Sequence, residues 1–268
     1  MEEMEVYLLS VEELNNNDAK AERLRELAMR NMDSVRLEKV KALKQGETGN
    51  LAIGAGLLLQ LAVRRGHARC PEMCPSLYSE MYSKLPSVVS ANICPELCPN
   101  ASDKLSPDVV PTCLQVSQVL DLLGGGEPMQ AEYCYGEHGK PDFAGGGLHF
   151  NLSHSGQYVC CALAEEEVGI DIQRMRPMKN MRVAERFFSQ GENDLLQECG
   201  SEKERQELFY RIWVRKEAYA KLSGAGIAAV VECDVMTKPL ESVCWQELEQ
   251  PEGYRMAVCR YVGGKNVL

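Results

Sequence analysis

Apolar residues are spaced as in a strand, then as in helices, then again as in strands, and the second half of the chain repeats this order. Strand-like spacing occupies residues 5–9, 130–135, 150–152 and 158–163, and later residues 168–172, 232–236 and 254–262. Helical spacing occupies residues 19–43, 51–65, 109–123, 183–188, 192–198 and 204–223. Residues 51–65 are apolar on every side, which predicts a buried helix. Ser10 stands three residues before Glu13, which predicts a capping box at a helix start.

The apolar run at residues 168–172 carries a carboxylate where the strand is expected to end. Val168, Ile170 and Ile172 alternate with small or polar residues, which is the period of two of a half-buried strand. Asp171 and Gln173 then project to the same face, so that two oxygen donors lie side by side. An aspartate that ends a strand is also a common turn former, and this pattern alone leaves both interpretations open.

A second polar pattern lies about 45 residues further on, in the segment IWVRKEAYAKLSGAG. Trp213, Glu217 and Lys221 are four residues apart and line one stripe of the predicted helix, with Lys216 beside them. A Glu–Lys pair at this spacing also stabilises a helix by itself, by about 0.2 to 0.5 kcal/mol. Together with Asp171, however, an acid and a base on one stripe suggest a site where a metal ion holds a pyrophosphate.

A third polar cluster lies between two apolar runs, at residues 139–163. Phe150 and Leu152 are expected to point into the core, and the residues between and after them carry amide, hydroxyl and imidazole groups that can donate to an anion. A hydrogen-bonded turn explains the same residues equally well. The polar members of the cluster are Asn151, Ser153, His154 and Ser155.

These segments together resemble the 4′-phosphopantetheinyl transferase superfamily, in its larger, monomeric, surfactin-type branch. The resemblance extends from about residue 36 to residue 221, and it implies an α+β fold of two similar halves that form a pseudodimer. The halves would be residues 1–164 and 165–268, with the coenzyme in the cleft between them. The matching segments are GKP at 139–141, FNLSHSG at 150–156, GIDI at 169–172, RFFSQGE at 186–192 and WVRKEAYAK at 213–221.

The resemblance implies that the 4′-phosphopantetheine group of coenzyme A is transferred to a serine of an acyl or peptidyl carrier protein. Adenosine 3′,5′-bisphosphate would be released, as by a holo-[acyl-carrier-protein] synthase type of enzyme. Attack of a hydroxyl on a pyrophosphate needs a cation, a base and an acid. By the resemblance, Asp171 and Glu217 hold Mg²⁺, Glu217 accepts the serine proton, and Lys221 neutralises or protonates the leaving phosphate.

The resemblance also implies a set of residues that bind the coenzyme. Gln173 is the third expected metal ligand, and many relatives carry a glutamate at its position. The set of ligands in this chain therefore has one negative charge fewer. Arg36 and Lys39 are expected to reach the 3′-phosphate, although a solvated basic helix face explains them equally well. The remaining residues expected at the coenzyme are Gly139, Lys140, Pro141, Asn151, Ser153, His154, Lys216 and Lys221.

Composition adds limits on partners and location. The chain has 268 residues, 45% of them apolar, which is enough for one large or two small domains with real cores. The net charge of −10 argues against nucleic acid or an anionic membrane as a general partner. No apolar run approaches the roughly 18 residues of a membrane span, and the first residues are acidic where a signal peptide is basic. We therefore expect a cytoplasmic protein.

Twelve cysteines are unusual for such a chain. Cys160, Cys161 and Cys259 stand in apolar runs and are expected to be small buried residues. The segment at about 70–113 differs, because it contains the near-repeats CPEMCP and CPELCP. Four thiols there leave three possibilities, which are a structural metal, disulfides, and a reduced surface insertion. Relatives lack most of this segment, which favours an insertion.

Positive charge gathers between residues 173 and 188, against the single Glu185. Carrier proteins are acidic around the modified serine, so this stretch is where we expect one to dock, and a solvated helix face is the alternative. Two other functions stay open, namely a coenzyme-binding protein without turnover and a metal-binding interaction protein. The basic residues are Arg174, Arg176, Lys179, Arg182 and Arg186.

Overall fold

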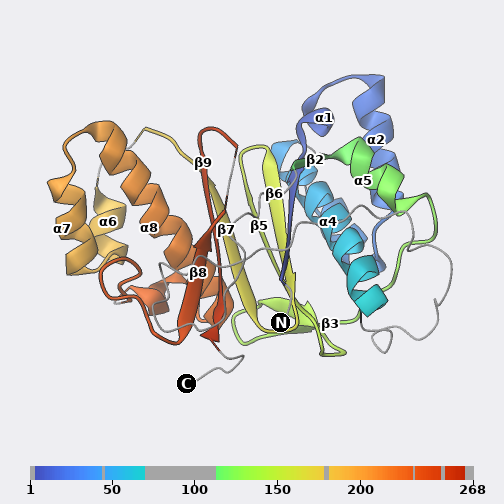
Figure 1. Cartoon of the computed structure of the whole chain (residues 1–268). Helices are drawn as coiled ribbons and strands as arrows, with labels where there is room; N and C mark the ends of the chain where they lie inside the picture. The colour runs from blue at the N-terminus through green and yellow to red at the C-terminus, as the bar shows by residue number, and fades with distance from the viewer. Residues whose placement is uncertain are drawn as a thin grey trace.

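Two groups of helices stand on either side of a central set of strands (Figure 1). The computed structural model describes residues 4–43, 46–69, 113–177, 181–231, 233–248 and 251–262. The elements of the first half are β1 (Glu5–Ser10), α1 (Glu12–Asn15), α2 (Ala19–Arg30), α3 (Ser34–Lys41), α4 (Glu47–Arg69), β2 (Cys113–Gln115), α5 (Val116–Leu123), β3 (Tyr133–Tyr135), β4 (Pro141–Phe143), β5 (His149–Ser155) and β6 (Tyr158–Ala164). Those of the second half are β7 (Val168–Arg174), α6 (Arg182–Phe187), α7 (Gln190–Glu198), α8 (Glu202–Ser223), a 3₁₀ helix (Ile227–Val230), β8 (Val243–Glu247) and β9 (Tyr254–Tyr261).

The strands form one sheet in each half and a small hairpin. The first sheet has the order β2-β1-β6-β5, the second has the order β7-β9-β8, and β3 pairs with β4. Strand β1 runs parallel to β2 and antiparallel to β6, with Leu8 opposite both Cys113 and Cys160. The second sheet is antiparallel, with Asp171 opposite Ala257. The α+β class predicted from the sequence is confirmed, whereas the division at residue 164 and the pseudodimer stay predictions.

The two faces of each sheet pack into different cores, so the structure has four layers. Tyr7 and Leu9 pack with the apolar residues of α4, whereas Val6 and Leu8 pack with Ile170 and Ile172 of β7. On the far side of the second sheet, a third core lies under α8. The order is therefore α4, first sheet, second sheet, α8 (Figure 1). The two sheets bury their facing sides against each other, and this common core joins the halves.

One edge of the interface between the sheets is closed by side chains. The strands β5 and β7 lie side by side, and hydroxyl or amide oxygens of β5 accept backbone N–H groups of β7. The bonds are Ile170 N to Asn151 Oδ1 at 3.0 Å, Ile172 N to Ser153 Oγ at 3.5 Å, and Arg174 N to Ser155 Oγ at 3.0 Å. The polar alternation in FNLSHS therefore has a structural role, because it satisfies backbone donors that would otherwise lack a strand partner.

Helix α8 approaches β7 more closely than a side chain would permit. A Cβ atom added to Gly169 would lie 2.0 Å from the carbonyl oxygen of Ala218 and 2.6 Å from the amide nitrogen of Leu222. The helix begins with Ser201, whose side chain accepts the N–H of Glu204, and ends at Gly224 in the left-handed conformation with φ +68°. The glycine of the GIDI segment thus lets α8 lie directly on the strand that carries Asp171.

The predicted elements need four corrections. Asp171 does not end its strand, since β7 continues to Arg174. The predicted strand at 232–236 is wrong for its described residues, which have irregular structure and a bend, and β8 at Val243–Glu247 carries the pairing instead. The strands β2 and β4 were not predicted, because three-residue strands leave almost no periodic pattern. The predicted capping box at Ser10 is wrong, because the residue that caps α1 is Val11.

The cysteines predicted to be buried are so, since Cys160, Cys161 and Cys259 lie inside the cores. Burial raises the pKa of the Cys161 thiol to about 12, so this side chain behaves as a small apolar residue. Residues 70–112 of the cysteine-rich segment lie outside the described residues. In the described helices, no stretch is long and apolar enough to cross a membrane.

Candidate functional site

A carboxylate, a hydroxyl and an ammonium group meet where β5, β7 and α8 come together. The Nζ atom of Lys221 lies 2.6 Å from Asp171 Oδ1 and 2.7 Å from Ser153 Oγ. The hydroxyl of Ser153 donates to the same Oδ1 at 2.6 Å. Asp171 is only 1% exposed, so this contact between opposite charges is little screened by water. The geometry brings together three residues that the sequence predicted for one site.

Glu217 lies one helical turn before Lys221 and adds a second carboxylate. Its pKa is raised, first by burial and then by the negative charge of Asp171, while Lys221 opposes the shift. Two carboxylates that disfavour each other's ionisation gain from a shared cation. Gln173 donates from Nε2 to Asp171 Oδ2 at 3.1 Å, which confirms that Gln173 and Asp171 share a face.

The donors at this site fit magnesium better than a softer metal. In the described part of the chain there is no group of three or more His, Cys, Asp or Glu side chains that could hold a metal alone. Magnesium typically takes one or two carboxylates and completes its shell with water and substrate phosphates. Asp171 and Glu217, with the amide oxygen of Gln173, are therefore a sufficient protein contribution for Mg²⁺ bound together with a phosphate.

His154 stands on the solvent side of Ser153. Partial loss of hydration lowers the pKa of its imidazole, Lys221 lowers it further, and Asp171 opposes the shift. The same two charges thus act on His154 and on Glu217, which places the imidazole at the rim of the site. At neutral pH the neutral form of His154 is favoured, and this form has one donor and one acceptor nitrogen.

A cavity of about 400 Å³ lies next to this group, between the β3–β4 hairpin and the last turn of α8. Lys140 crosses from the hairpin and donates to the carbonyl of Leu222 at 3.0 Å. Burial lowers the pKa of Lys140, and the nearby Glu167 and Asp142 oppose the shift. A partly desolvated ammonium group on a cavity wall favours an anionic ligand. The lining residues are Cys134, Tyr135, Gly136, Glu137, His138, Lys140, Asp142, Glu167, Leu222, Ser223, Gly224 and Ala225.

The basic residues of α3 lie beside the same hairpin. The Nζ atom of Lys39 is 3.3 Å from the hydroxyl oxygen of Tyr135 and 5.1 Å from the centre of its ring. The guanidinium carbon of Arg36 is 5.7 Å from the ring centre of Tyr133. Since Tyr135 also lines the cavity, α3 adds two basic side chains near Lys140. Sequence reasoning did not select the tyrosines, although their alternation in YCY around an exposed cysteine was a signal.

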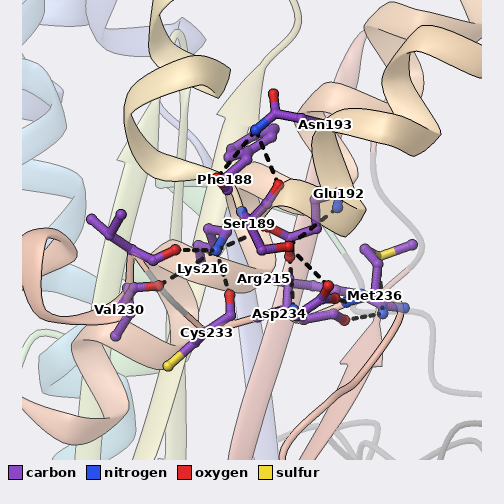
Figure 2. Close-up of polar contacts among 12 residues, drawn as sticks. Phe188, Ser189, Glu192, Asn193, Arg215, Lys216, Val230, Cys233, Asp234 and Met236 are labelled. Carbon is purple, nitrogen blue, oxygen red and sulfur yellow. Dashed lines mark hydrogen bonds and ion pairs between the residues drawn. The ribbon is translucent and has the colours of Figure 1, made fainter.

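Lys216 does not lie at this site, and its predicted role at the coenzyme is wrong. Figure 2 shows its ammonium group inside the second half, directed at carbonyl groups and at α7. Its Nζ atom lies 3.0 Å from Glu192 Oε2, both side chains are fully buried, and it also donates to the carbonyls of Val230 and Cys233. Consecutive helix residues point about 100° apart, so Glu217 can face the site while Lys216 faces away from it.

Asn151 also needs a correction. It is 6% exposed, and its amide oxygen accepts the N–H of Ile170 between the two sheets. Its function here is to join β5 to β7, and direct contact with a coenzyme is not supported.

Two further predicted residues, Gly139 and Pro141, shape the hairpin that carries Lys140. Gly139 is in the left-handed conformation with φ +78°. Trp213 stacks on Phe209 with parallel rings 6.4 Å apart, so it packs beside the site without entering it.

This geometry agrees with comparisons with known proteins. Residues 167–259 match the model of a family described as the 4′-phosphopantetheinyl transferase superfamily. The matched region contains Asp171, Gln173, Glu217 and Lys221, and the relatives described next extend the similarity beyond it. Residues 167–259 of the chain are therefore similar to this superfamily.

Several curated relatives carry the same name. The chain is 40% identical over 123 residues to the 4′-phosphopantetheinyl transferase HetI of Nostoc sp., a match that covers 44% of this chain and 52% of HetI. It is 42% identical over 133 residues to AcpT of Salmonella typhimurium, covering 48% and 66%. It is 33% identical over 138 residues to Sfp of Bacillus subtilis, covering 47% and 59%. The chain thus spans between about half and two thirds of the length of these relatives.

Proposed function

We propose that this protein transfers the 4′-phosphopantetheine group of coenzyme A to a serine of an acyl or peptidyl carrier protein. The observation that carries the proposal is the contact of Lys221 and Ser153 with buried Asp171, beside Glu217 and a cavity walled by Lys140. Such a group combines charges that can receive a pyrophosphate with a carboxylate that can receive a proton. The relatives, which are named as 4′-phosphopantetheinyl transferases, support the same activity.

The residues divide the reaction between them. Asp171 and Glu217, with Gln173, would hold Mg²⁺, which would neutralise charge on the pyrophosphate. The carrier serine oxygen forms a bond to the β-phosphorus as the bond to the oxygen of adenosine 3′,5′-bisphosphate breaks. Glu217 accepts the serine proton and so acts as the general base. Lys221 carries the positive charge that stabilises the departing phosphate.

The basic side chains of the cavity and of α3 determine how the coenzyme lies. Lys140 is placed to contact phosphate oxygens, because its ammonium group lies between the cavity and the turn of α8 that follows Lys221. Arg36 and Lys39, beside the tyrosines of the hairpin, are placed for the 3′-phosphate at the far end. This order leaves the phosphopantetheine arm directed toward Ser153, His154 and solvent.

The carrier protein is proposed to dock on the exposed basic residues at the end of β7 and along α6. Arg174, Arg176, Arg182 and Arg186 are exposed there, and Lys179 lies outside the described residues. An acidic carrier surface would be attracted to this region and guided to the open side of the site. We also propose that the protein acts as a cytoplasmic monomer of the surfactin-type branch, which the sequence predicted.

The deciding experiment is mass spectrometry of an apo carrier protein incubated with this protein, coenzyme A and Mg²⁺. Acyl and peptidyl carriers are tested separately, since either class of carrier agrees with the site. The expected result is a gain of one phosphopantetheine group on at least one carrier, at its serine and not on a Ser→Ala carrier. Tight binding of coenzyme A without any transfer to several apo carriers would instead support a binding protein without turnover.

A further inference from the structure

A histidine and an aspartate form a pair next to the cavity and have no role in the reaction described above. Asp142 of β4 lines the cavity, and its Oδ2 atom lies 2.5 Å from Nδ1 of His149 at the start of β5. The other oxygen of Asp142 accepts the N–H of Phe143 at 2.9 Å. Both side chains are only partly exposed, at 29% for His149 and 21% for Asp142. His149 and the N–H of Phe143 thus hold in place a carboxylate that lines the cavity.

The pair faces two further charges, Lys140 and Glu167. Asp142 and Glu167 both act on Lys140, and Glu167 and Lys140 both act on His149. The four groups sum to zero charge when His149 is protonated and to −1 when it is neutral. In the neutral case two carboxylates share one ammonium group, and they compete with any anionic ligand for it. The protonation of His149 therefore determines how strongly Lys140 is held by its own neighbours.

We propose that His149 is a positioning residue for coenzyme binding, because it engages the carboxylate of Asp142 and so leaves Lys140 to the phosphates of the ligand. The inference rests on the proposed function, in which Lys140 faces the coenzyme. His149 has no need to touch the ligand. It acts by pairing with the carboxylate of Asp142. Without this partner, the carboxylate would attract the ammonium group of Lys140 away from the phosphates and would itself repel the phosphates.

The pair makes binding depend on pH in a known direction. The hydrogen bond to Asp142 raises the pKa of His149, burial lowers it, Asp142 and Glu167 raise it by their charge, and Lys140 lowers it. With the net shift upward, His149 is protonated at pH 6 and loses its proton as the pH rises through the raised pKa. Coenzyme A should therefore bind more tightly at low pH and more weakly at high pH.

Equilibrium binding of coenzyme A by calorimetry, between pH 6 and 8.5 in EDTA, tests the proposal. EDTA keeps metal binding at Asp171 and Glu217 out of the measurement. In the unaltered protein the affinity should fall several-fold across this range. His149→Gln should bind about threefold to tenfold more weakly at pH 6, where a tenfold change corresponds to about 1.4 kcal/mol. It should also lack most of the pH dependence. Lys20→Gln is the control, since it changes an exposed charged side chain of α2, which is not among the residues that line the cavity, and leaves the pair intact.

A double variant separates positioning from direct contact. Asp142→Asn combined with His149→Gln removes the competing carboxylate, so it should bind coenzyme A better than His149→Gln alone. In steady-state transfer, His149→Gln should raise the KM for coenzyme A and leave kcat nearly unchanged. Thermal unfolding of each variant shows that the folded protein is being compared.

Two results would overturn the inference. One is a pH dependence in His149→Gln that parallels that of the unaltered protein. The other is a double variant no better than His149→Gln, which would mean that His149 touches the coenzyme itself. If the unaltered protein binds no coenzyme A at any pH, either in EDTA or with Mg²⁺ added, the proposed function fails instead, and the two failures are thereby distinguished.

Discussion

Asp171 receives hydrogen bonds from Ser153, Lys221 and Gln173, and each of these partners limits what the carboxylate can do. Lys221 balances its charge, Ser153 fixes the orientation of Oδ1, and Gln173 approaches Oδ2. Glu217 adds a second carboxylate, whose pKa is raised first by burial and then by the negative charge of Asp171. A cation that arrives with phosphates restores the balance of charge, so metal and coenzyme should bind together.

Replacing Glu217 by glutamine should abolish most transfer and leave the fold intact. The amide keeps the size of the side chain but cannot accept the serine proton or supply a second negative charge. We expect a rate at least about 10²-fold lower, the usual minimum effect of general acid–base catalysis, measured as holo-carrier formation by mass spectrometry. A variant that keeps more than about a tenth of the rate would contradict the role given to Glu217.

Gln173 should influence the magnesium requirement more than the turnover. Gln173→Glu adds the missing negative charge beside Asp171, so it should lower the Mg²⁺ concentration that gives half the maximal rate. Gln173→Ala should be tolerated far better than Asp171→Ala. A Mg²⁺ titration of the three variants at saturating coenzyme A measures both effects. An unchanged titration in Gln173→Glu would place this side chain outside the metal shell.

Lys216 should influence stability, in contrast to its neighbours on α8. Lys216→Met leaves Glu192 charged and fully buried, which typically costs about 3 to 5 kcal/mol in the free energy of unfolding. Urea unfolding should show this loss, and the double variant Lys216→Met with Glu192→Leu should recover much of it. Lys216→Met with normal stability but no coenzyme binding would restore the role that the sequence predicted for this lysine.

The long helix α8 shows which features of an element follow from sequence. The sequence predicted a helix at residues 204–223 from the spacing of Glu217 and Lys221 and from the glycines that follow. The helix begins two residues earlier, at Glu202, and ends at Ser223 as predicted. Helical periodicity gives the angle between neighbouring side chains, but it does not say which side of the helix meets the sheet. Lys216 was therefore misplaced, because its burial depends on Glu192 and on carbonyls beyond Gly226 that lie far away in the sequence.

The close approach of α8 to β7 should not survive a single added methyl group. Gly169→Ala places a Cβ atom within 2.0 Å of the Ala218 carbonyl, and backbone atoms on a long helix cannot move away independently. We expect a destabilised protein that has lost transfer, since the shift separates Glu217 and Lys221 from Asp171. Overpacking of this kind typically costs about 1 to 3 kcal/mol or more.

The control for Gly169→Ala is Gly200→Ala, where the nearest atom would be a carboxylate oxygen of Glu204 at 3.4 Å, at the end of a flexible side chain. Thermal unfolding and the transfer rate are measured for both variants. Equal effects of the two substitutions would show that the packing of α8 on β7 is not what holds the site together.

At the scale of the molecule, the site forms where segments far apart in the sequence meet. The motifs predicted which residues make up the site, because each of them stands in a distinctive segment. These residues are Ser153, Asp171, Glu217 and Lys221. The layered packing was not predictable from the sequence. The hydrogen bonds of Asn151 and Ser155 to β7 connect residues 19 positions apart, and no local periodicity indicates such a parallel pairing. The cavity was missed for the same reason, as it joins the hairpin to the end of α8.

The segment between α4 and β2 should be dispensable for transfer, because it lies outside every sequence motif that carries a predicted site residue. Replacing residues 71–111 with a short Gly/Ser linker joins the end of α4 at Arg69 to the start of β2 at Cys113. Loop-closure entropy changes slowly with length, by about 0.6 kcal/mol for each doubling, so shortening should affect stability little. Coenzyme A binding and the transfer rate of the shortened protein should match those of the full chain within about threefold. Stoichiometric zinc in the full protein, lost together with activity on chelation and restored by zinc but not by magnesium, would instead assign this segment a part in the function.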